Sequence, residues 1–225
     1  MLEQQHQSQT LLRSLAHEIL NPLGGIRGAA QLLEQDTANT ELREYTQLII
    51  READRLKNLL RRVLGPSAPL QMKPHNVHDV IEHVTRLLLT DTLNISCWHD
   101  YDPSIPEIIC DRESMIQVLI NIVANAIRAV SATEQAAITI RTRVERNFTI
   151  RNRLVKLVCR IQIIDNGPGV DPLISETLFY PLVTASEGGT GLGLSIAQSL
   201  VIQHGGLIEC QSVPGNTVFT ITVPI

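Results

Sequence analysis

The first 66 residues carry two apolar stripes in which the steps alternate between three and four residues. This spacing is typical of the seam of a coiled coil or an antiparallel helical bundle. Two helices with one stripe each cannot enclose a core alone, so we expect them to pair with a second copy in a four-helix bundle. The alternative is that they fold back onto the second half of the chain. The stripe residues are Leu12, Leu15, Ile19, Ile26 and Leu33, followed by Leu42, Tyr45, Ile49, Ala53, Leu56, Leu60 and Val63.

A histidine lies on the side of the first helix that faces away from this seam. His17 takes the f position of the heptad, the position farthest from the seam. Glu18 follows it, and Asn21 lies one turn further on along the same face, because residues i and i+4 are neighbours on a helix. Pro22 removes a backbone donor, so we expect the helix to bend just after the histidine.

Three interpretations of this histidine compete. Exposed histidine and glutamate are common on solvated helix faces and need no special explanation. A zinc-protease helix, H-E-x-x-H, is excluded because Asn21 stands where the second histidine is required. In the third interpretation His17 is a nucleophile: one ring nitrogen attacks phosphorus while Glu18 takes the proton from the other.

Composition narrows the class of protein. The 225 residues are 44% hydrophobic but only 3% aromatic, so the chain can bury a sizeable core made mainly of aliphatic side chains. The net charge of −4 argues against nucleic acid or an anionic membrane as the main partner. The four cysteines are scattered without a C-x-x-C pair, which indicates neither a zinc site nor a disulfide framework. We find no apolar run of about 20 residues and no signal peptide, so a cytoplasmic protein is expected.

The second half of the chain mixes helical and strand patterns without a strict βαβ repeat. A helix stop and linker, G-P-S-A-P at residues 65–69, separates it from the two helices. This order favours an α+β sandwich with helices on one face of a sheet. We expect helices at residues 77–89, 111–130 and up to 203, and strands at 94–99, 137–144, 154–164, 207–211 and 218–223.

One of these helices carries amides on an otherwise apolar face. Asn121 and Asn125 lie one turn apart in N-I-V-A-N-A-I-R, and Arg128 follows at the next turn. An asparagine carbonyl can complete the octahedral shell of Mg²⁺, and the arginine can meet a phosphate. The alternative is a pair of amides that only bridge elements of the core.

Two glycine-rich segments follow. In D-N-G-P-G, Gly167 and Gly169 form a tight turn after an apolar strand, and Asp165 could accept a hydrogen bond from the amine of adenine. The run G-G-T-G-L-G at residues 188–193 opens a helix and can cradle phosphate with backbone N–H groups. Its members are Gly189, Thr190, Gly191, Leu192 and Gly193. Neither glycine-rich segment is specific alone, but the asparagine-bearing helix followed by these two segments is a strong signal of a nucleotide site.

Together these segments resemble the motifs of sensor histidine kinases. Residues 17–22 (H-E-I-L-N-P) resemble the H box, 121–126 the N box, 165–169 the G1 box, 189–193 the G2 box and 178–181 (L-F-Y-P) the F box. The stretches N-P-L-G-G-I-R-G-A-A-Q-L-L-E, D-Y-D-P-S-I-P-E and L-F-Y-P-L-V are especially similar to nitrogen-regulation (NtrB-type) kinases. The resemblance covers essentially the whole chain, without the family's PAS-like sensor domain.

The resemblance implies a fold and an activity. Residues 1–66 would form a dimerisation and phosphoacceptor hairpin, and residues 67–225 an ATP-binding α/β sandwich of the gyrase/Hsp90/histidine-kinase type. The cofactors would be ATP and Mg²⁺. The partners would be a second copy of the chain, an NtrC-like response regulator and a PII signal protein, with no nucleic acid and no membrane.

The resemblance also implies residue roles. His17 would accept the phosphoryl group, and Glu18 would polarise the His17 imidazole. Asn21 would align water when the regulator is dephosphorylated. Asn125 would be the metal ligand and Asp165 the adenine anchor, and the glycine runs would shape the lid over the nucleotide. Related ATPases carry a glutamate base at the position of Asn121. An amide cannot take a proton, which favours a kinase over a plain ATPase. A docking scaffold with a vestigial nucleotide pocket is disfavoured because every expected motif is intact.

Overall fold

The computed structural model describes residues 19, 22–35, 39–64, 69–89, 94–184 and 191–225. The chain divides into two compact units, Met1–Ser67 and Ala68–Ile225. The described part does not include residues 17, 18, 20 and 21 of the H box. The predicted bend just after His17 therefore also lies outside it.

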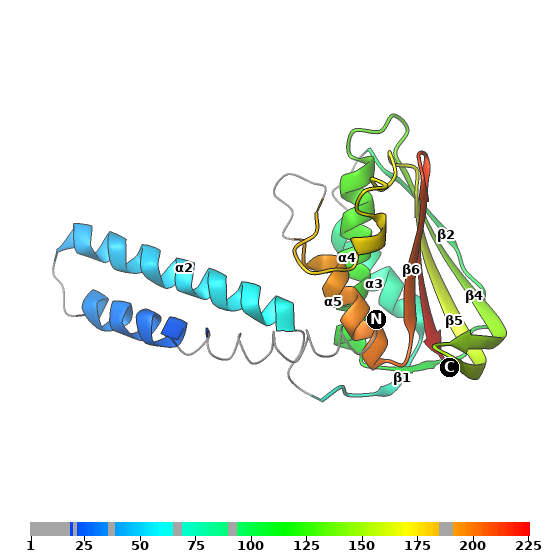
Figure 1. The fold of residues 1–225 in the computed structure, drawn as a ribbon, viewed down its shortest axis with the longest axis horizontal. Helices are drawn as coiled ribbons and strands as arrows, with labels where there is room; N and C mark the ends of the chain where they lie inside the picture. Colours follow the sequence, from blue (N-terminus) through cyan, green and yellow to red (C-terminus); the bar gives the residue numbers. More distant parts are fainter. Residues whose placement is uncertain (1–18, 20–21, 36–38, 65–68, 90–93, 185–190) are drawn as a thin grey trace. The chain divides into compact units, whose positions relative to one another are not determined.

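The first unit contains a helical hairpin (Figure 1). Residues 22–35 are helical, and the second helix, α2, spans Thr40–Leu64. Asn39 caps the start of α2, because its side-chain oxygen accepts hydrogen bonds from the N–H groups of Glu41 at 2.9 Å and Leu42 at 3.5 Å. An ion pair of 2.8 Å between Arg27 and Asp54 ties the two helices together.

Small side chains fill the inside of this hairpin, and the large apolar ones remain outside. Ala30, Thr46 and Ala53 are buried. Of the predicted stripe, Ala53 is thus buried, Leu12, Leu15, Leu60 and Val63 lie outside the described side chains, and seven residues are between 42% and 61% exposed in the single chain. These exposed members are Ile19, Ile26, Leu33, Leu42, Tyr45, Ile49 and Leu56. The hairpin therefore leaves an apolar surface that one copy of the unit does not cover.

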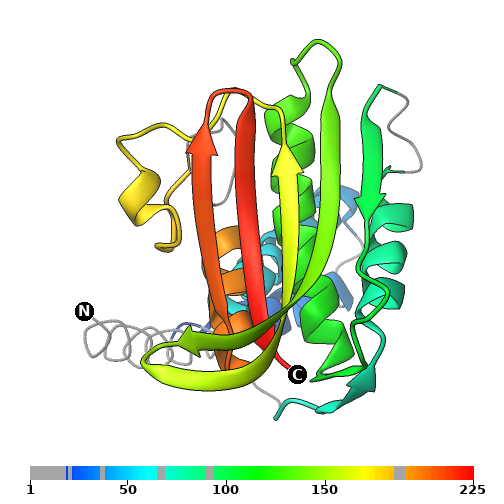
Figure 2. The same ribbon diagram turned by 90° about the vertical axis from the view of Figure 1, so that its right-hand side faces the viewer.

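The second unit is a sandwich of helices on a sheet (Figures 1 and 2). The five strands lie in the order β2-β4-β5-β7-β6, and only the β2–β4 pair is parallel. The helices α3, α4 and α5 cover one face. The elements are β1 (Lys73–His75), α3 (Val77–Leu89), β2 (Ser96–Asp100), β3 (Ile108–Cys110), α4 (Arg112–Val130), β4 (Ala137–Ile150), β5 (Arg153–Asp165), a 3-10 turn (Ser175–Thr177), α5 (Gly193–Gln203), β6 (Leu207–Val213) and β7 (Asn216–Pro224).

The core between sheet and helices is aliphatic, as the low aromatic content predicted. Alternate residues of the strands point toward the helices, so one row of β4 and β5 is fully buried. The fully buried large side chains include Ile138, Ile140, Ile161, Ile163 and Ile221 from the sheet and Met115, Leu119 and Ile122 from α4. Asp165 continues this row at the end of β5, where its backbone pairs with Ile138 and Thr217.

Helix α4 is the central helix of this core. Asp111 caps it by accepting a hydrogen bond from the N–H of Ser114 at 2.8 Å. By length and composition alone α4 is apolar enough to cross a membrane, although no such segment was expected from the sequence. Nine of its residues are buried in the sandwich, so its hydropathy is that of a core helix.

The sandwich confirms the expected fold class, and the structure extends it in three ways. The strands predicted at 137–144 and 154–164 are longer and form one hairpin of 14 and 13 residues. Strands β1 and β3 form a small antiparallel sheet that was not predicted, because three-residue strands carry too short a pattern. The parallel pairing of β2 with β4 was also not predicted, since it is a non-local contact.

Candidate functional site

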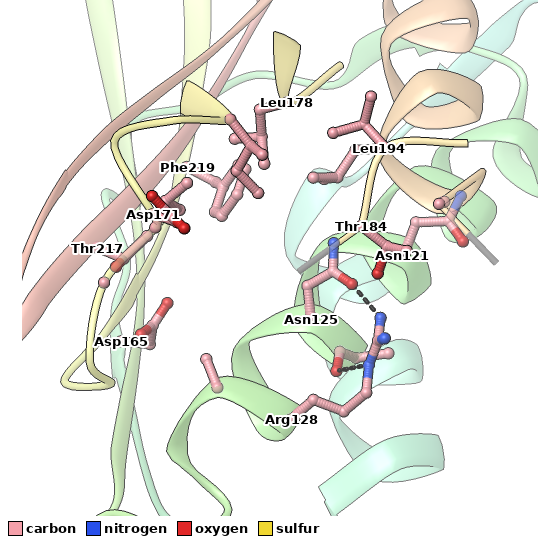
Figure 3. Close-up of a pocket in the computed structure, with 18 of the residues that line it drawn as sticks. Asn121, Asn125, Arg128, Asp165, Asp171, Leu178, Thr184, Leu194, Thr217 and Phe219 are labelled. Atoms are coloured by element: carbon pink, nitrogen blue, oxygen red, sulfur yellow. Dashed lines mark hydrogen bonds between the residues drawn. The ribbon is translucent and has the colours of Figure 1, made fainter. Parts of the chain in front are cut away.

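A cavity of about 410 Å³ opens beside α4 in the second unit (Figure 3). It lies among α4, the end of β5, the segment 168–184, the start of α5 and β7. Seven predicted site residues line it together: Asn121, Asn125, Arg128, Asp165, Gly169, Gly191 and Gly193. The fold therefore brings the three motifs of the second half to one place.

The wall formed by α4 carries the two amides. The side-chain oxygen of Asn121 accepts a hydrogen bond from Gln117 at 3.2 Å. Its Nδ2 atom is buried and has no hydrogen-bond partner within the described part of the chain. A buried donor without a partner is costly, so this amide indicates that a ligand or water completes the site.

Asn125 lies one turn further along α4, where its side-chain oxygen accepts a hydrogen bond from Arg128 (Figure 3). Arg128 also donates from Nε to the carbonyl of Ala124 at 3.2 Å. The oxygen that could serve as a hard ligand for Mg²⁺ is thus held by a cation. No group of three or more His, Cys, Asp or Glu side chains gathers around a cation site in the ranges that the structure describes. The donor set fits a metal that takes one amide oxygen from the protein and its other ligands from phosphate and water.

The opposite end of the cavity is formed by Asp165, whose residue surface is only 3% exposed. One carboxylate oxygen accepts a hydrogen bond from the N–H of Gly167 at 3.0 Å. Burial raises the pKa of this carboxyl above its ordinary value, and the bond from Gly167 opposes that shift. In Figure 3 the side chain points into the cavity. It can accept a hydrogen bond from a flat ring that carries an amine.

Gly167 does not line the cavity, but it shapes the turn that holds Asp165. A Cβ atom at this position would lie 2.8 Å from the Asp165 oxygen and 3.1 Å from the backbone of Ala129. Any side chain would therefore displace the carboxylate or push the turn away from α4.

Gly191 closes the other side of the site. Its carbonyl accepts a hydrogen bond from the N–H of Leu182 at 2.9 Å, its φ is 64°, and a Cβ atom would lie 2.5 Å from the Leu182 backbone. Leu192 is buried and does not line the cavity. Gly193 begins α5, and its Cβ position is 3.5 Å from the Asn121 oxygen. The N-terminus of α5, which favours anions, therefore lies beside the orphaned amide.

Part of the cavity lining was not predicted from the sequence. Leu178 was noted as part of the F box only, and Phe219 and Thr217 come from β7. Phe179 packs edge-on against Phe219 with ring centroids 6.5 Å apart. Such strand residues give no local signal of a site; only the register that places Thr217 opposite Asp165 reveals them. Ala124 and Pro168 also line the cavity and were noted only as members of the N and G1 boxes. The remaining unpredicted lining residues are Ala129, Val170, Asp171, Ile174, Val183, Thr184 and Leu194.

Five predicted site residues lie outside the described residues: His17, Glu18, Asn21, Gly189 and Thr190. The cavity itself has one polar end at Asp165, apolar walls, and a second polar end formed by amides, a cation and a helix N-terminus. This arrangement suits a nucleotide whose ring meets the carboxylate and whose phosphates meet α4 and α5.

Two family models match the chain. The model described as "Histidine kinase-, DNA gyrase B-, and HSP90-like ATPase" matches residues 110–225. The model described as "His Kinase A (phospho-acceptor) domain" matches residues 7–67.

Individual relatives agree with these matches. The chain is 49% identical over 223 residues to the sensory histidine kinase/phosphatase NtrB of Vibrio alginolyticus, which covers 99% of this chain and 64% of the relative. The chain thus spans a little under two thirds of that relative's length. Among solved structures, full-length ShkA in complex with AMPPNP has a TM-score of 0.65 at 25% identity, covering 96% of this chain and 45% of ShkA. The histidine kinase ThkA in complex with the response regulator protein TrrA has a TM-score of 0.59 at 27% identity, covering 96% of this chain and 61% of ThkA.

Proposed function

Because this chain belongs to the sensor histidine kinases, we propose that it transfers the γ-phosphoryl group of ATP to His17. The observation that carries this proposal is the cavity in which Asn121, Asn125 and Asp165 converge at the N-terminus of α5. In the proposed cycle the phosphoryl group passes to an aspartate of an NtrC-like response regulator, and the same chain assists its removal in nitrogen-regulation signalling.

We assign the two units separate tasks. Residues 1–66 are proposed to be the dimerisation and phosphoacceptor hairpin, and residues 67–225 the ATP-binding domain. The uncovered apolar stripes support a homodimer formed through the first unit, since pairing would remove them from water. A PII signal protein is the proposed controller, as the resemblance to nitrogen-regulation kinases implies. A cytoplasmic location is proposed on the same basis, and all four cysteines are free.

The residues of the cavity have distinct proposed roles. Asp165 accepts a hydrogen bond from the adenine amine. Arg128 gives up its hydrogen bond to Asn125 and contacts a phosphate instead. The Asn125 oxygen is the metal ligand. Mg²⁺, when bound, neutralises charge on the phosphates. Asn121 donates its orphaned N–H to a phosphate or to a bound water, and as an amide it does not act as a base toward water. That property supports transfer to His17 over direct hydrolysis.

At the phosphoacceptor site, Glu18 is proposed to take the proton from one imidazole nitrogen while the other attacks phosphorus. Asn21 aligns water when the phosphorylated regulator is dephosphorylated. The glycine run 189–193 shapes the cover over the phosphates.

The decisive experiment incubates the whole chain with Mg²⁺ and γ-labelled ATP beside a His17→Gln variant. Phosphohistidine is labile in acid and stable in base, so acid-labile label that disappears in the variant is the expected result. Label that survives the substitution would exclude His17 as the acceptor. Steady release of phosphate by both proteins would instead indicate a plain ATPase.

The chain departs from the resemblance at Leu20, where this subgroup usually carries lysine. A cation beside the acceptor histidine would help to position phosphate. We expect Leu20→Lys to shift the balance between the kinase and phosphatase rates without abolishing either. The two rates are measured with the same regulator, and unchanged values of both would contradict this expectation.

A further inference from the structure

The charged residues of the second unit are unevenly distributed along the sequence, and the nucleotide site does not require this distribution. Residues 141–160 contain seven of the 19 lysines and arginines of the chain but only one of its 23 acidic residues. The rest of residues 68–225 contains 14 acidic residues but only four lysines and arginines. One segment is therefore strongly basic within a domain that is otherwise acidic.

This segment is the far half of the β4–β5 hairpin. Strand β2 pairs with β4 only as far as Arg141, and β7 pairs with β5 only from Val158 onward. Between these points the two strands pair only with each other. They curl across the sheet face that the helices leave open (Figures 1 and 2). We call residues 142–157 the basic ribbon.

The cations at the base of the ribbon are used within the fold. Arg141 and Arg143 both form ion pairs of 2.7 Å with Asp100, and Arg160 pairs with Glu145 at 3.0 Å. The hydrogen bonds from Arg143 and Arg141 hold the pKa of Asp100 below its ordinary value. These three arginines fix the ribbon to its neighbours and are not available to a partner.

Four other cations have no ion pair among the residues that the structure describes: Arg146, Arg151, Arg153 and Lys156. All four are exposed, and Leu154, between Arg153 and Lys156 in the sequence, is 64% exposed. Three of the four are arginines, whose planar guanidinium groups bind carboxylates through two parallel hydrogen bonds and are enriched in protein interfaces.

The tip of the ribbon adds an independent observation. Arg151 and Asn152 form its two-residue turn with φ of 47° and 65°. Such a turn favours Asn-Gly, because both central residues need a positive φ. Asn152 suits this geometry, whereas Arg151 holds a left-handed conformation that costs free energy. A cation is kept at the tip against the preference of the backbone, which is typical of functional positions.

We propose that the basic ribbon is a docking element for an acidic surface of a partner protein. Single-stranded nucleic acid is disfavoured because no aromatic side chain of the ribbon is exposed for stacking on bases. A long duplex or a flat anionic membrane would also approach the acidic remainder of the unit. The register places Arg146 and Arg153 on one face of the ribbon and Leu154 and Lys156 on the other, so an acidic surface that embraces the protruding ribbon can contact these residues without approaching the acidic remainder of the unit.

The test compares two variants of the whole chain that lose the same charge. The first is Arg151→Asn with Arg153→Gln and Lys156→Gln. The second is Lys73→Gln with Arg86→Gln and Arg112→Gln, which removes the three cations of the unit that lie outside both residues 141–160 and the nucleotide cavity. Their dissociation constants for a labelled 20-residue glutamate-rich peptide are measured by fluorescence anisotropy at 50 mM and 200 mM salt.

We expect the ribbon variant to bind the peptide about tenfold more weakly than the parent chain at 50 mM salt, and the control to lose at most about twofold. The difference should shrink at 200 mM salt because screening weakens exposed ion pairs. ATP binding should be the same in all three proteins. Equal losses in both variants would overturn the proposal, as would tighter ribbon-dependent binding to phosphatidylserine vesicles or duplex DNA than to the peptide.

A single substitution tests the role of the tip separately. Arg151→Asn should raise the melting temperature by about 2 °C, because asparagine tolerates the positive φ, while it weakens peptide binding. Arg151→Lys keeps the charge and should retain most of the binding. A melting temperature that rises with no loss of peptide binding would show that the arginine is not needed for docking.

Discussion

At the residue scale, the proposed role of Asp165 as adenine anchor predicts that nucleotide binding depends on pH. Burial favours the protonated carboxyl, so its pKa in the folded chain is raised. The resulting contribution to folding stability is complete below the unfolded pKa and is lost as pH rises through the raised value. Nucleotide binding has the opposite sign, because the adenine amine needs an ionised acceptor. Adenine nucleotide affinity should therefore fall on acidification at a higher pH than an exposed aspartate would give.

The pH dependence of nucleotide affinity is measured by calorimetric titration with ADP between pH 7.5 and 5, with Asp165→Asn as the matched variant. The variant should bind about tenfold more weakly at pH 7.5, since a hydrogen bond to a charged acceptor contributes about 1.5–3 kcal/mol. Its affinity should change less with pH than that of the parent chain. Identical pH profiles for the two proteins would exclude Asp165 as the titrating group.

Alanine substitutions at Gly191 and Gly215 distinguish the effect of backbone strain from that of a steric clash. Both have positive φ, 64° and 82°, but only Gly191 lacks room for a Cβ atom. Either alanine substitution should lower the free energy of unfolding by about 1–2 kcal/mol through strain. Gly191→Ala should also weaken ATP binding, because the Leu182 backbone beside the cavity must move. Thermal denaturation and calorimetry measure the two effects, and unaltered ATP affinity of Gly191→Ala would contradict the assigned role.

At the element scale, the start of α4 depends on Asp111. Its carboxylate accepts hydrogen bonds from the N–H of Ser114 at 2.8 Å and of Gln71 at 2.7 Å. Burial alone would raise the pKa of Asp111, but these hydrogen bonds lower it below its ordinary value. Its contribution to stability is present above the unfolded pKa and is lost as pH falls through the lowered pKa.

Removing this cap should loosen the helix that carries Asn121 and Asn125. We expect Asp111→Ala to lower the free energy of unfolding by about 1 kcal/mol, and Asp111→Asn to lower it less because asparagine also caps helices. Urea denaturation of the whole chain at pH 7 gives both values. Equal losses for the two variants would mean that the charge, and not the cap, is what matters.

At the scale of the whole molecule, the exposed stripe of the helical hairpin predicts a concentration-dependent assembly. Ile49 lies in this stripe and is 42% exposed in the single chain. Placing an aspartate there would bury a charge in the proposed dimer interface, which is strongly unfavourable. Sedimentation equilibrium should show Ile49→Asp as a monomer under conditions in which the parent chain is dimeric.

Arg51→Asp is the control for this prediction, because it adds the same side chain at an exposed position outside the stripe. It should remain dimeric. A dimeric Ile49→Asp variant would show that the hairpin stripe is covered in some other way.

Periodicity and motif content in the sequence determined much of this protein. The helices at 40–64 and 77–89 and the cap of α4 at Asp111 follow from local patterns, because helical hydrogen bonds and caps join residues a few positions apart. The grouping of Asn121, Asn125 and Asp165 with glycine-rich segments in one nucleotide site was predicted from the order of the motifs, since no single motif is specific alone, and Gly169, Gly191 and Gly193 do line the same cavity.

Only the tertiary structure decided the rest, because it depends on contacts between residues far apart in the chain. The parallel β2–β4 pair and the small β1–β3 sheet are pairings that no local pattern specifies. Phe219 and Thr217 enter the site through the register of β7 against β5. The charge on the basic ribbon can be counted in the sequence, but which cations Asp100 and Glu145 neutralise is decided by how the strands pack, and this leaves four exposed.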